Sequence, residues 1–531
     1  MSGWAVRAGP GWILVLAVSL TAGLFGLEGH VGLDLADEGY LWYGAQATAR
    51  GEVPIRDFQA YDPARYYWTA AWFRLAGDDG VVALRVACSA FQSLGLVAAL
   101  FVLRRSTRAP WLLALAGAGS LLWIWPLFRA FDCVPPLVGT LVATRLLERP
   151  TLRRHLEAGV FVGLAACFGR NHGLYAFVSC LVAAVAGWRK GEAAELSRRL
   201  AGLAAGILAG YAPMLVMLAS VPGFREAVGE GVAFLARRGV TTIARPIPWP
   251  WTLPYQRLAL GDSAVRLSVG LLYLLVPLFH LGCGWALVRA RALVTAPVLG
   301  AGVLVGAPYL HHAFSRADLY HLAPAMGPFL LALLSLCALV ARSRARVAAG
   351  GGWAALLAIS LLPAGARHLP YLEAALGRDK LFDRRVGRDV VWLRGPSADI
   401  AAAVKRIDSE HLGPADEVFV APVWPAVYPL LGRRAPVWPL ILTWPLSSIE
   451  QQRLVSRIEG RRVGWGLVCD IPIDNRPELR FSISHAAVWS HLETAYLPVP
   501  VRGLPEACRL LCRRPCTGGK PPQPLSGAGT Q

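Results

Sequence analysis

Long apolar runs separated by short arginine-rich segments dominate this chain. A transmembrane helix needs about 20 mostly apolar residues, and about eleven runs approach that length. The arginine-rich loops all fall on one side of the predicted spans, as the positive-inside rule expects, although they were not used to define the spans. The pattern therefore predicts a polytopic α-helical membrane protein. The predicted spans are residues 12–27, 81–103, 111–128, 131–147, 156–168, 174–188, 200–221, 266–288, 292–310, 323–341 and 353–366.

Two longer polar segments, residues 28–80 and 222–265, fall on the side opposite the arginines. The first predicts helices over 37–50 and 64–76, each followed by a glycine that suits a helix end, and the second of these fits a helix in the membrane interface. The first apolar run could be a cleaved signal peptide. It lacks a clear small-residue cleavage site, which favours an uncleaved helix with a cytoplasmic amino terminus.

After residue 367 the chain becomes more charged and its apolar runs become short. Short strand-like runs at 417–421 and 466–470 are interspersed with helical stretches at 398–411 and 447–459. This alternation predicts a small α/β domain outside the membrane. We therefore expect a membrane domain over 1–367 that includes the loop 28–80, an extracytoplasmic α/β domain over 368–516, and a tail over 517–531 that is disordered by composition.

Composition also supports a membrane protein, which we expect in an inner or plasma membrane. The chain is 55% hydrophobic and 16% charged, whereas soluble proteins carry about 25% charged residues. Its net charge of +19 comes largely from loop arginines, so we expect no nucleic-acid partner. Three cysteines near the end, Cys508, Cys512 and Cys516, cannot fill a four-ligand zinc site alone. They indicate a disulfide or free thiols, and the sequence does not say which.

Adjacent carboxylates, Asp37 and Glu38, directly follow the first span. Charge so close to the membrane is costly and is often functional. Neighbouring residues on a helix do not share a face, so the two acids should have different roles. The alternative is that both only stabilise the start of the helix at 37–50, because acids favour helix amino termini.

The residues around this pair resemble a known family. Asp37-Glu38-Gly39-Tyr40, the run Gly51-Glu52-Val53-Pro54-Ile55-Arg56-Asp57-Phe58 and Tyr61-Asp62-Pro63 resemble the GT-C membrane glycosyltransferases. They are most similar to the protein O-mannosyltransferase and lipid A aminoarabinose transferase branch. The chain departs from the pattern of uncharacterised bacterial relatives by having Ile55 for Tyr and Asp62 for Gly. The resemblance covers roughly the first 370 residues.

The resemblance implies a polyprenyl-phosphate-linked sugar as donor, inversion at the anomeric carbon and reaction at the outer side of the membrane. A leaving phosphate needs no proton, so a single base that activates the acceptor hydroxyl suffices, unlike the two opposed carboxyls of glycosidases. We assign Asp37 as the base and Glu38 as an orienting residue. Neither the acceptor, which could be a glycan, lipid or protein, nor the identity of the sugar is fixed.

Cations should hold the leaving phosphate, and arginine suits this task because its fork binds phosphate at two points. Two predicted outer turns offer such groups. The substrate-binding candidates are Arg170 and His172 at one turn, Arg316, Asp318 and His321 at the other, and Asp57 and Tyr61 in the first loop. The alternatives are snorkelling arginines, interfacial histidine hydrogen bonds, and a surface ion pair of Asp57 with Arg56.

Asp34, Asp37 and Glu38 could offer oxygen ligands to a divalent metal, but the O-mannosyltransferase-like branch favours none, so we predict no cofactor. Two other function classes stay open. A transporter or lipid flippase would tend to show repeated halves and interrupted helices, and neither is evident. A membrane scaffold that binds a partner through its carboxyl-terminal domain is the other. The oligomeric state is not predicted.

Overall fold

The computed structural model describes residues 11–186, 188, 193–238, 242–340 and 346–516; the tail predicted over 517–531 lies outside them. Its contacts define two compact units. The membrane unit comprises Met1–Leu27 and Arg85–Leu376, and the loop–sheet unit comprises Glu28–Leu84 and Gly377–Gln531. Each is described by itself.

A helix lies at every predicted span. Six of the described helices are long and apolar enough to cross a membrane, so the polytopic membrane fold is confirmed, whereas about eleven crossings stay a prediction. The helices are α1 (Gly11–Glu28), α4 (Val81–Leu103), α5 (Pro110–Leu121), η1 (Leu127–Arg129), α6 (Ala130–Glu148), α7 (Leu152–Phe168), α8 (Arg170–Ala186), α9 (Ala193–Ser220), α10 (Phe224–Arg238), η2 (Pro250–Thr252), η3 (Tyr255–Arg257), α11 (Leu260–Arg289), α12 (Pro297–Ser315), α13 (Leu319–Val340) and α14 (Arg346–Ala375).

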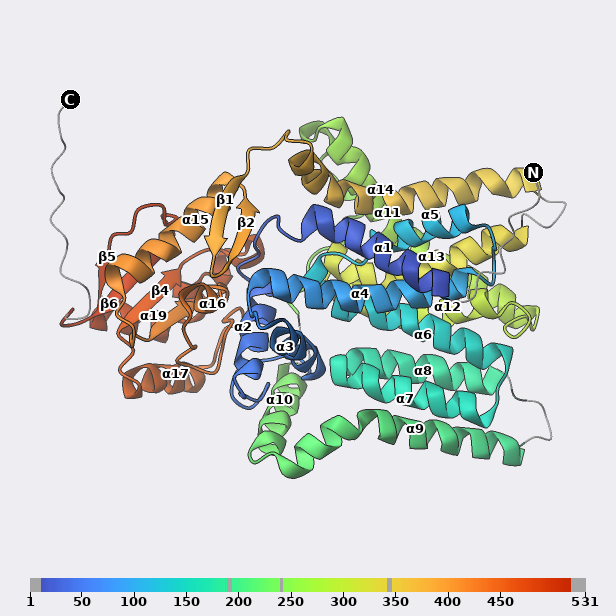
Figure 1. Ribbon diagram of the computed structural model, residues 1–531, viewed down its shortest axis with the longest axis horizontal. Coiled ribbons are helices and arrows are strands. Elements are labelled where there is room, and N and C mark those ends of the chain that lie inside the picture. Colours follow the sequence, from blue (N-terminus) through green and yellow to red (C-terminus); the bar gives the residue numbers. More distant parts are fainter. Residues whose placement is uncertain (1–10, 187, 189–192, 239–241, 341–345, 517–531) are drawn as a thin grey trace. The chain divides into compact units, whose positions relative to one another are not determined.

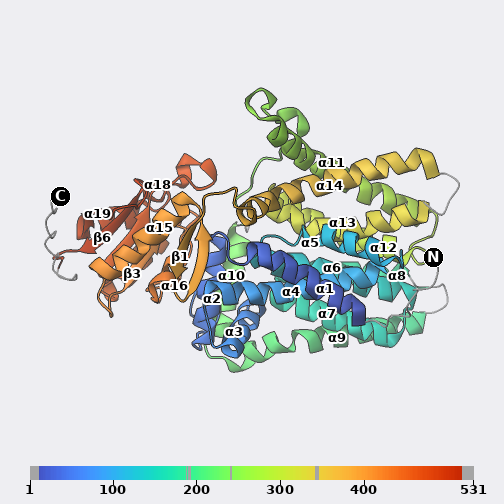
Figure 2. The ribbon, with the colours of Figure 1, turned by 45° about the horizontal axis from the view of Figure 1, so that its top comes forward.

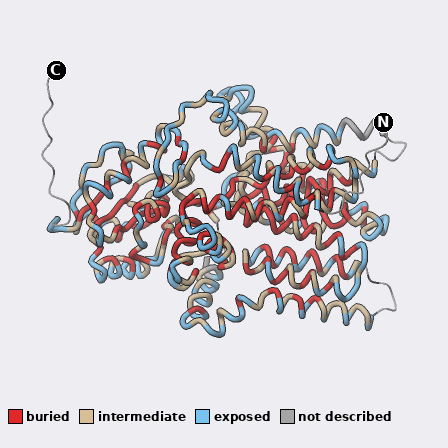
Figure 3. The backbone as a smooth tube through the Cα atoms, viewed as in Figure 1, coloured by how far each residue is buried: buried red, intermediate tan, exposed pale blue. Residues whose placement is uncertain are grey.

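Small residues allow close helix packing in the membrane unit. Helices α7, α8 and α9 lie side by side (Figures 1 and 2). A Cβ added at Gly163 of α7 would lie 2.4 Å from the carbonyl oxygen of Ile207 on α9, and one at Gly210 would lie 2.2 Å from that of Val160. Small residues at helix interfaces bring membrane helices into backbone contact. Figure 3 shows buried residues concentrated on the central helices of this unit.

The loop–sheet unit contains a hairpin and a four-stranded mixed sheet. The strand order is β3-β4-β6-β5, with β3 and β4 parallel and the other pairs antiparallel. The predicted strands at 417–421 and 466–470 are confirmed as β3 and β4. The elements are α2 (Asp37–Ala49), α3 (Ala64–Ala76), β1 (Phe382–Val386), β2 (Asp389–Leu393), α15 (Gly395–Arg406), η4 (Ile407–His411), β3 (Val418–Ala421), α16 (Val427–Leu431), α17 (Ser448–Gly460), β4 (Trp465–Cys469), η5 (Ile473–Asn475), η6 (Pro477–Leu479), α18 (Phe481–Ser484), α19 (Ala486–Ala495), β5 (Tyr496–Val499) and β6 (Cys508–Arg513).

The first long loop packs against the carboxyl-terminal region. Residues 28–80 were predicted to belong to the membrane domain over 1–367. The structure instead places Glu28–Leu84 in the same compact unit as the sheet. Val31 forms a β-bridge with Trp392, and the backbone N–H of Ala426 donates to the carbonyl of Leu35 at 3.1 Å. These contacts join segments more than 350 residues apart, which no local pattern could reveal.

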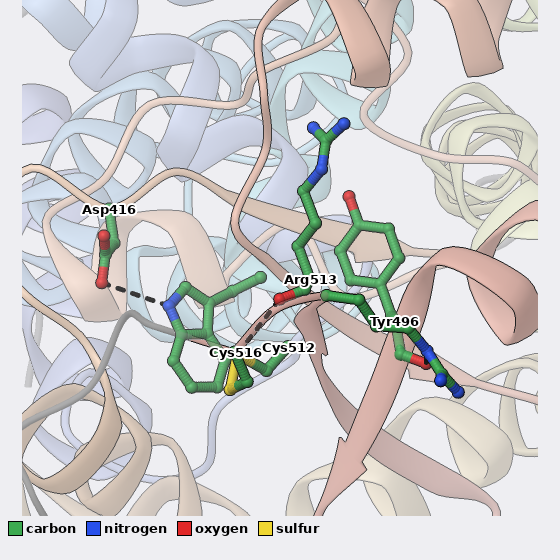
Figure 4. The surroundings of a disulfide bond; sticks show 7 residues. Asp416, Tyr496, Cys512, Arg513 and Cys516 are labelled. Atoms are coloured by element: carbon green, nitrogen blue, oxygen red, sulfur yellow. Dashed lines mark hydrogen bonds between the residues drawn. A yellow bond between two sulfur atoms is a disulfide. The ribbon is translucent and has the colours of Figure 1, made fainter.

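The carboxyl-terminal cysteines form two disulfides, Cys469–Cys508 and Cys512–Cys516. The first joins paired residues of the neighbouring strands β4 and β6. Figure 4 shows the surroundings of the second, where Asp416 accepts a hydrogen bond from the indole N–H of Trp465 at 3.1 Å. The sequence analysis did not consider Cys469 as a partner. The other six cysteines all lie in the membrane unit and are not in disulfides.

Candidate functional site

Three carboxylates share the turn that opens α2. One oxygen of Asp34 accepts hydrogen bonds from the backbone N–H groups of Ala36 and Asp37, both at 2.8 Å. The Glu38 carboxylate accepts from the backbone N–H of Asp34 at 3.2 Å. This reciprocal arrangement resembles a capping box and satisfies donors that a helix start leaves unpaired. Asp34, two residues before the N-cap Ala36, therefore satisfies the backbone N–H of Asp37, the first residue of α2.

The three acids differ in their surroundings. Glu38 is 3% exposed, and Asp37 is partly exposed. Burial, with a smaller contribution from the charges of Asp37 and Glu38, raises the pKa of Asp34 to about 6. Glu38 thus stabilises the turn through its hydrogen bond with Asp34, whereas Asp37 keeps contact with solvent. This difference is compatible with the predicted roles of Glu38 as an orienting residue and Asp37 as the base. The sequence analysis did not assign Asp34 a catalytic role, although three acids within five residues were a visible signal.

Tyr61 lies next to the first turn of α2. Its ring is 45% exposed and packs edge-to-face against Tyr40, with ring centroids 5.0 Å apart. Tyr40 follows Asp37 by three residues, so the two share a helix face. The guanidinium of Arg65 lies 4.9 Å from the centre of the Tyr61 ring. The structure therefore brings Tyr61 close to the carboxylate turn.

Asp57 closes its own loop. Its two oxygens accept from Arg56 at 2.7 and 2.8 Å, and one also accepts from the backbone N–H of Val53 at 2.7 Å. The hydrogen bond from Arg56 is the main cause of the lowered pKa of Asp57. These contacts match the surface-pair alternative for Asp57. In the same loop Ile55 has φ +75°, which is rare for a β-branched residue, and its carbonyl accepts from the indole of Trp438.

The candidates in the membrane unit form a separate polar cluster. Arg170 and His172 lie in the first turn of α8 rather than in a loop, because α7 ends at Phe168 and only Gly169 separates the two helices. Arg170 is exposed, whereas His172 is 2% exposed. The ring nitrogens of His172 contact the Tyr309 hydroxyl at 2.9 Å and an Asp132 oxygen at 3.3 Å.

Arg316, Asp318 and His321 form one network between α12 and α13. Arg316 donates to Asp318 at 2.6 Å, and the His321 ring contacts the other carboxylate oxygen at 2.8 Å. Burial opposes ionisation of Asp318, but its contacts with His321 and Arg316 together hold its pKa well below the ordinary value. The contacts with Arg316 and His321 therefore favour an ionised Asp318.

His312 joins these two groups. Its ring stacks on His321 at a centroid distance of 5.0 Å and lies 6.4 Å from His172. Its buried Nε2 has no hydrogen-bond partner among the described residues. His312 therefore links the residues of the two predicted turns within the membrane unit. No role in the site was predicted for His312, nor for Asp132 and Arg129, whose side chains pair at 3.3 Å. For Asp132 the sequence did contain a signal, because a carboxylate inside an apolar run is often functional.

No group of three or more His, Cys, Asp or Glu residues in the described part of the chain is arranged to hold a metal ion. The acids of the α2 turn serve as acceptors for backbone N–H groups. That the protein uses no metal stays a prediction.

Comparison with known proteins gives a likeness only at the level of structure. No family model matches, and no curated protein matches in sequence. The crystal structure of ArnT from Cupriavidus metallidurans bound to undecaprenyl phosphate superposes with a TM-score of 0.51 at 15% identity, over 97% of this chain and all of that one. This chain has the fold of ArnT. The resemblance to the GT-C glycosyltransferases is therefore confirmed for the fold.

A second solved structure is also similar. The oligosaccharyltransferase of Archaeoglobus fulgidus in its apo form gives a TM-score of 0.48 at 11% identity, over 93% of this chain and 73% of that chain.

Proposed function

We propose that this protein is an integral membrane glycosyltransferase that moves a sugar from a polyprenyl-phosphate donor to an acceptor hydroxyl. The observation that supports the proposal is the fold shared over 97% of the chain with a structure bound to undecaprenyl phosphate. Fold alone does not define function, so the proposal also uses the carboxylate turn and the polar cluster of the membrane unit.

Asp37 acts as the base in this proposal. Its carboxylate takes the proton of the acceptor hydroxyl while the hydroxyl oxygen forms a bond to the anomeric carbon. The bond from that carbon to the phosphate oxygen breaks with inversion, and the lipid phosphate leaves as an anion that needs no proton. Glu38 orients the turn, because its carboxylate already holds the backbone N–H of Asp34. Tyr61 offers an exposed ring against which a sugar could stack, and it packs on Tyr40, which lies one helical turn after Asp37.

The polar cluster of the membrane unit supplies the cations for the leaving phosphate. Arg170 is exposed on the first turn of α8, and we assign it direct contact with the phosphate. Arg316 pairs with Asp318, which also contacts His321, and we assign Arg316, Asp318 and His321 to the same binding group. His172 completes the proposed binding group.

The reaction is proposed to occur on the extracytoplasmic side. Both disulfides lie within residues 469–516, whereas the six cysteines of the membrane unit are not in disulfides. Disulfides persist in oxidising compartments, which supports an extracytoplasmic sheet region. Together with the arginine-rich loops, this favours a cytoplasmic amino terminus in the inner or plasma membrane.

The decisive experiment uses the full chain in lipid nanodiscs with a panel of undecaprenyl-phosphate-linked sugars and measures release of undecaprenyl phosphate. Asp37→Asn should lower the transfer rate by about 10²- to 10⁴-fold, the usual contribution of a general base. The matched control is Asp79→Asn, which changes an exposed acid of the same loop and should keep the wild-type rate. Full activity of Asp37→Asn would exclude Asp37 as the base. Lipid movement across liposomes without transfer would instead favour a flippase.

A further inference from the structure

The carboxyl-terminal segment 426–441 holds the loop that carries Asp37 at several separate points. We call these contacts the clasp. They are the hydrogen bonds from Ala426 N–H to the Leu35 carbonyl at 3.1 Å, from Ala435 N–H to the Tyr43 hydroxyl at 2.9 Å, and from Leu440 N–H and Ile441 N–H to the side-chain oxygen of Gln59, both at 2.9 Å. All lie within the loop–sheet unit.

The tightest point of the clasp is Gly39, directly after the carboxylate pair. A Cβ at this position would lie 2.4 Å from both the Cβ and the backbone nitrogen of Ala426 and 2.7 Å from its Cα. Real Cβ atoms do not approach other atoms this closely, so only glycine fits without a shift of one backbone. The first turn of α2 therefore rests directly on residue 426, which is itself fully buried.

Segment 426–441 is in turn fixed to the sheet. The Tyr428 ring packs against the Tyr43 ring with centroids 5.3 Å apart, and its hydroxyl accepts from the backbone N–H of Val420 in β3 at 3.1 Å. Tyr428 is fully buried. A continuous packed path thus runs from the central strands through Tyr428 to the helix that carries Asp37.

A helix as short as α2 needs such support. It has 13 residues, and isolated helices of that length are marginal in water. Every residue from Glu38 to Thr48 is buried, and the clasp supplies part of that cover. Residues on loops require rigid elements to hold a reactive group in place.

We propose that Ala426, Tyr428 and the segment up to Ile441 are positioning residues for Asp37, so that the sheet region is a working part of the transfer site. The proposal rests on the proposed function for its activity readout. Its structural part, that the clasp fixes the turn at Asp37, stands independently of that function.

The test compares full-length Gly39→Ala and Ala426→Leu with the matched control Ala415→Leu, at an exposed alanine of the same region. We expect faster amide exchange in peptides over 34–48 for the two clasp variants and wild-type exchange for the control. We also expect kcat for undecaprenyl-phosphate-linked sugars to fall by about 10²-fold, the effect of a misplacement near 1 Å, with the donor KM little changed.

A gentler pair covers the case in which these variants fail to fold. Gln59→Ala removes the acceptor of two N–H groups, whereas Gln59→Glu keeps acceptor oxygens and should restore both exchange and kcat. Wild-type exchange over 34–60 in Gly39→Ala, Ala426→Leu and Gln59→Ala would overturn the clasp. Faster exchange with unchanged kcat would overturn the positioning role. If the wild type transferred no sugar from any donor, the proposed function would fail, while the exchange measurements would still decide whether the clasp holds the turn.

Discussion

Asp34→Asn should stabilise the protein at neutral pH. Asp34 has a pKa near 6 because it is largely buried and close to the charges of Asp37 and Glu38. Its ordinary value is 3.8. The asparagine side chain keeps the oxygen that accepts from the N–H groups of Ala36 and Asp37. It removes a negative charge beside two others, and its NH₂ group is a donor.

The magnitude follows from the two pKa values. A carboxyl whose pKa is higher in the folded state favours folding when protonated, and this contribution is lost as the pH rises from about 4 to about 6. The difference between 6 and 3.8 corresponds to about 3 kcal/mol. Because Asp34 is partly exposed, solvent screening reduces this figure, and we expect about 1–2 kcal/mol of stabilisation by Asp34→Asn above pH 6.

Thermal unfolding in detergent, followed by tryptophan fluorescence across this pH range, measures the effect. For a unit of this size each kcal/mol moves Tm by about 2–4 °C. Asp34→Asn should raise Tm at about pH 8 and leave it nearly unchanged at about pH 4, where the wild-type carboxyl is already protonated. Equal Tm values for the two proteins at both pH values would refute the account of Asp34. A shift of the same size at both would show that charge is not its cause.

Three further predictions concern other parts of the chain. Ile55→Gly should be less destabilising than Val53→Gly in the same loop by about 1–2 kcal/mol, because of these two residues only Ile55 has a positive φ. Thermal unfolding measures the difference, and an equal loss of stability in both variants would exclude strain at Ile55. Gly163→Ala should cost about 1–3 kcal/mol by overpacking against α9, whereas Gly23→Ala, which meets no atom within 4 Å, should be neutral in the same assay. Leu75 is 81% exposed on α3, which precedes the span α4 in the sequence. A photo-cross-linking residue at Leu75 should label lipid more than one at Asp79, and equal labelling would place this face of α3 away from the membrane interface.

The membrane helices could be predicted from sequence because their signal is local. Long apolar runs require no knowledge of tertiary contacts, and every predicted span overlaps a helix, although the bounds of the spans 111–128 and 292–310 differ from those of α5 and α12. Helix α3 begins at Ala64 and ends at Ala76 as predicted, and the following Gly77 adopts the left-handed conformation typical of a helix end. The strands β5 and β6 were missed because each is short, and β6 also pairs with β4, which is distant in sequence.

The candidate site could be predicted only in part. The sequence predicted Asp37, Glu38, His172 and His321 as candidates, because charged or polar residues beside apolar runs stand out, and their roles stay predictions. The hydrogen bonds that Asp34 accepts at the start of α2 could not be predicted, because they depend on backbone geometry. Nor could the sequence show that Asp318 already engages Arg316, since an ion pair depends on side-chain direction rather than on spacing.

The clasp also changes how a membrane scaffold must be distinguished from an enzyme. Deleting the sheet region would remove Ala426 and Ala435, whose N–H groups bind the loop that carries Asp37. In either case α2 would lose contacts that keep its residues buried. Loss of activity after deletion would therefore not show whether the sheet region binds a partner or supports catalysis. Point changes that spare the fold separate the two. A scaffold requires the surface of the sheet region and is indifferent to the charge of Asp37, whereas an enzyme built as proposed tolerates changes on that surface and loses transfer when Asp37 is neutralised.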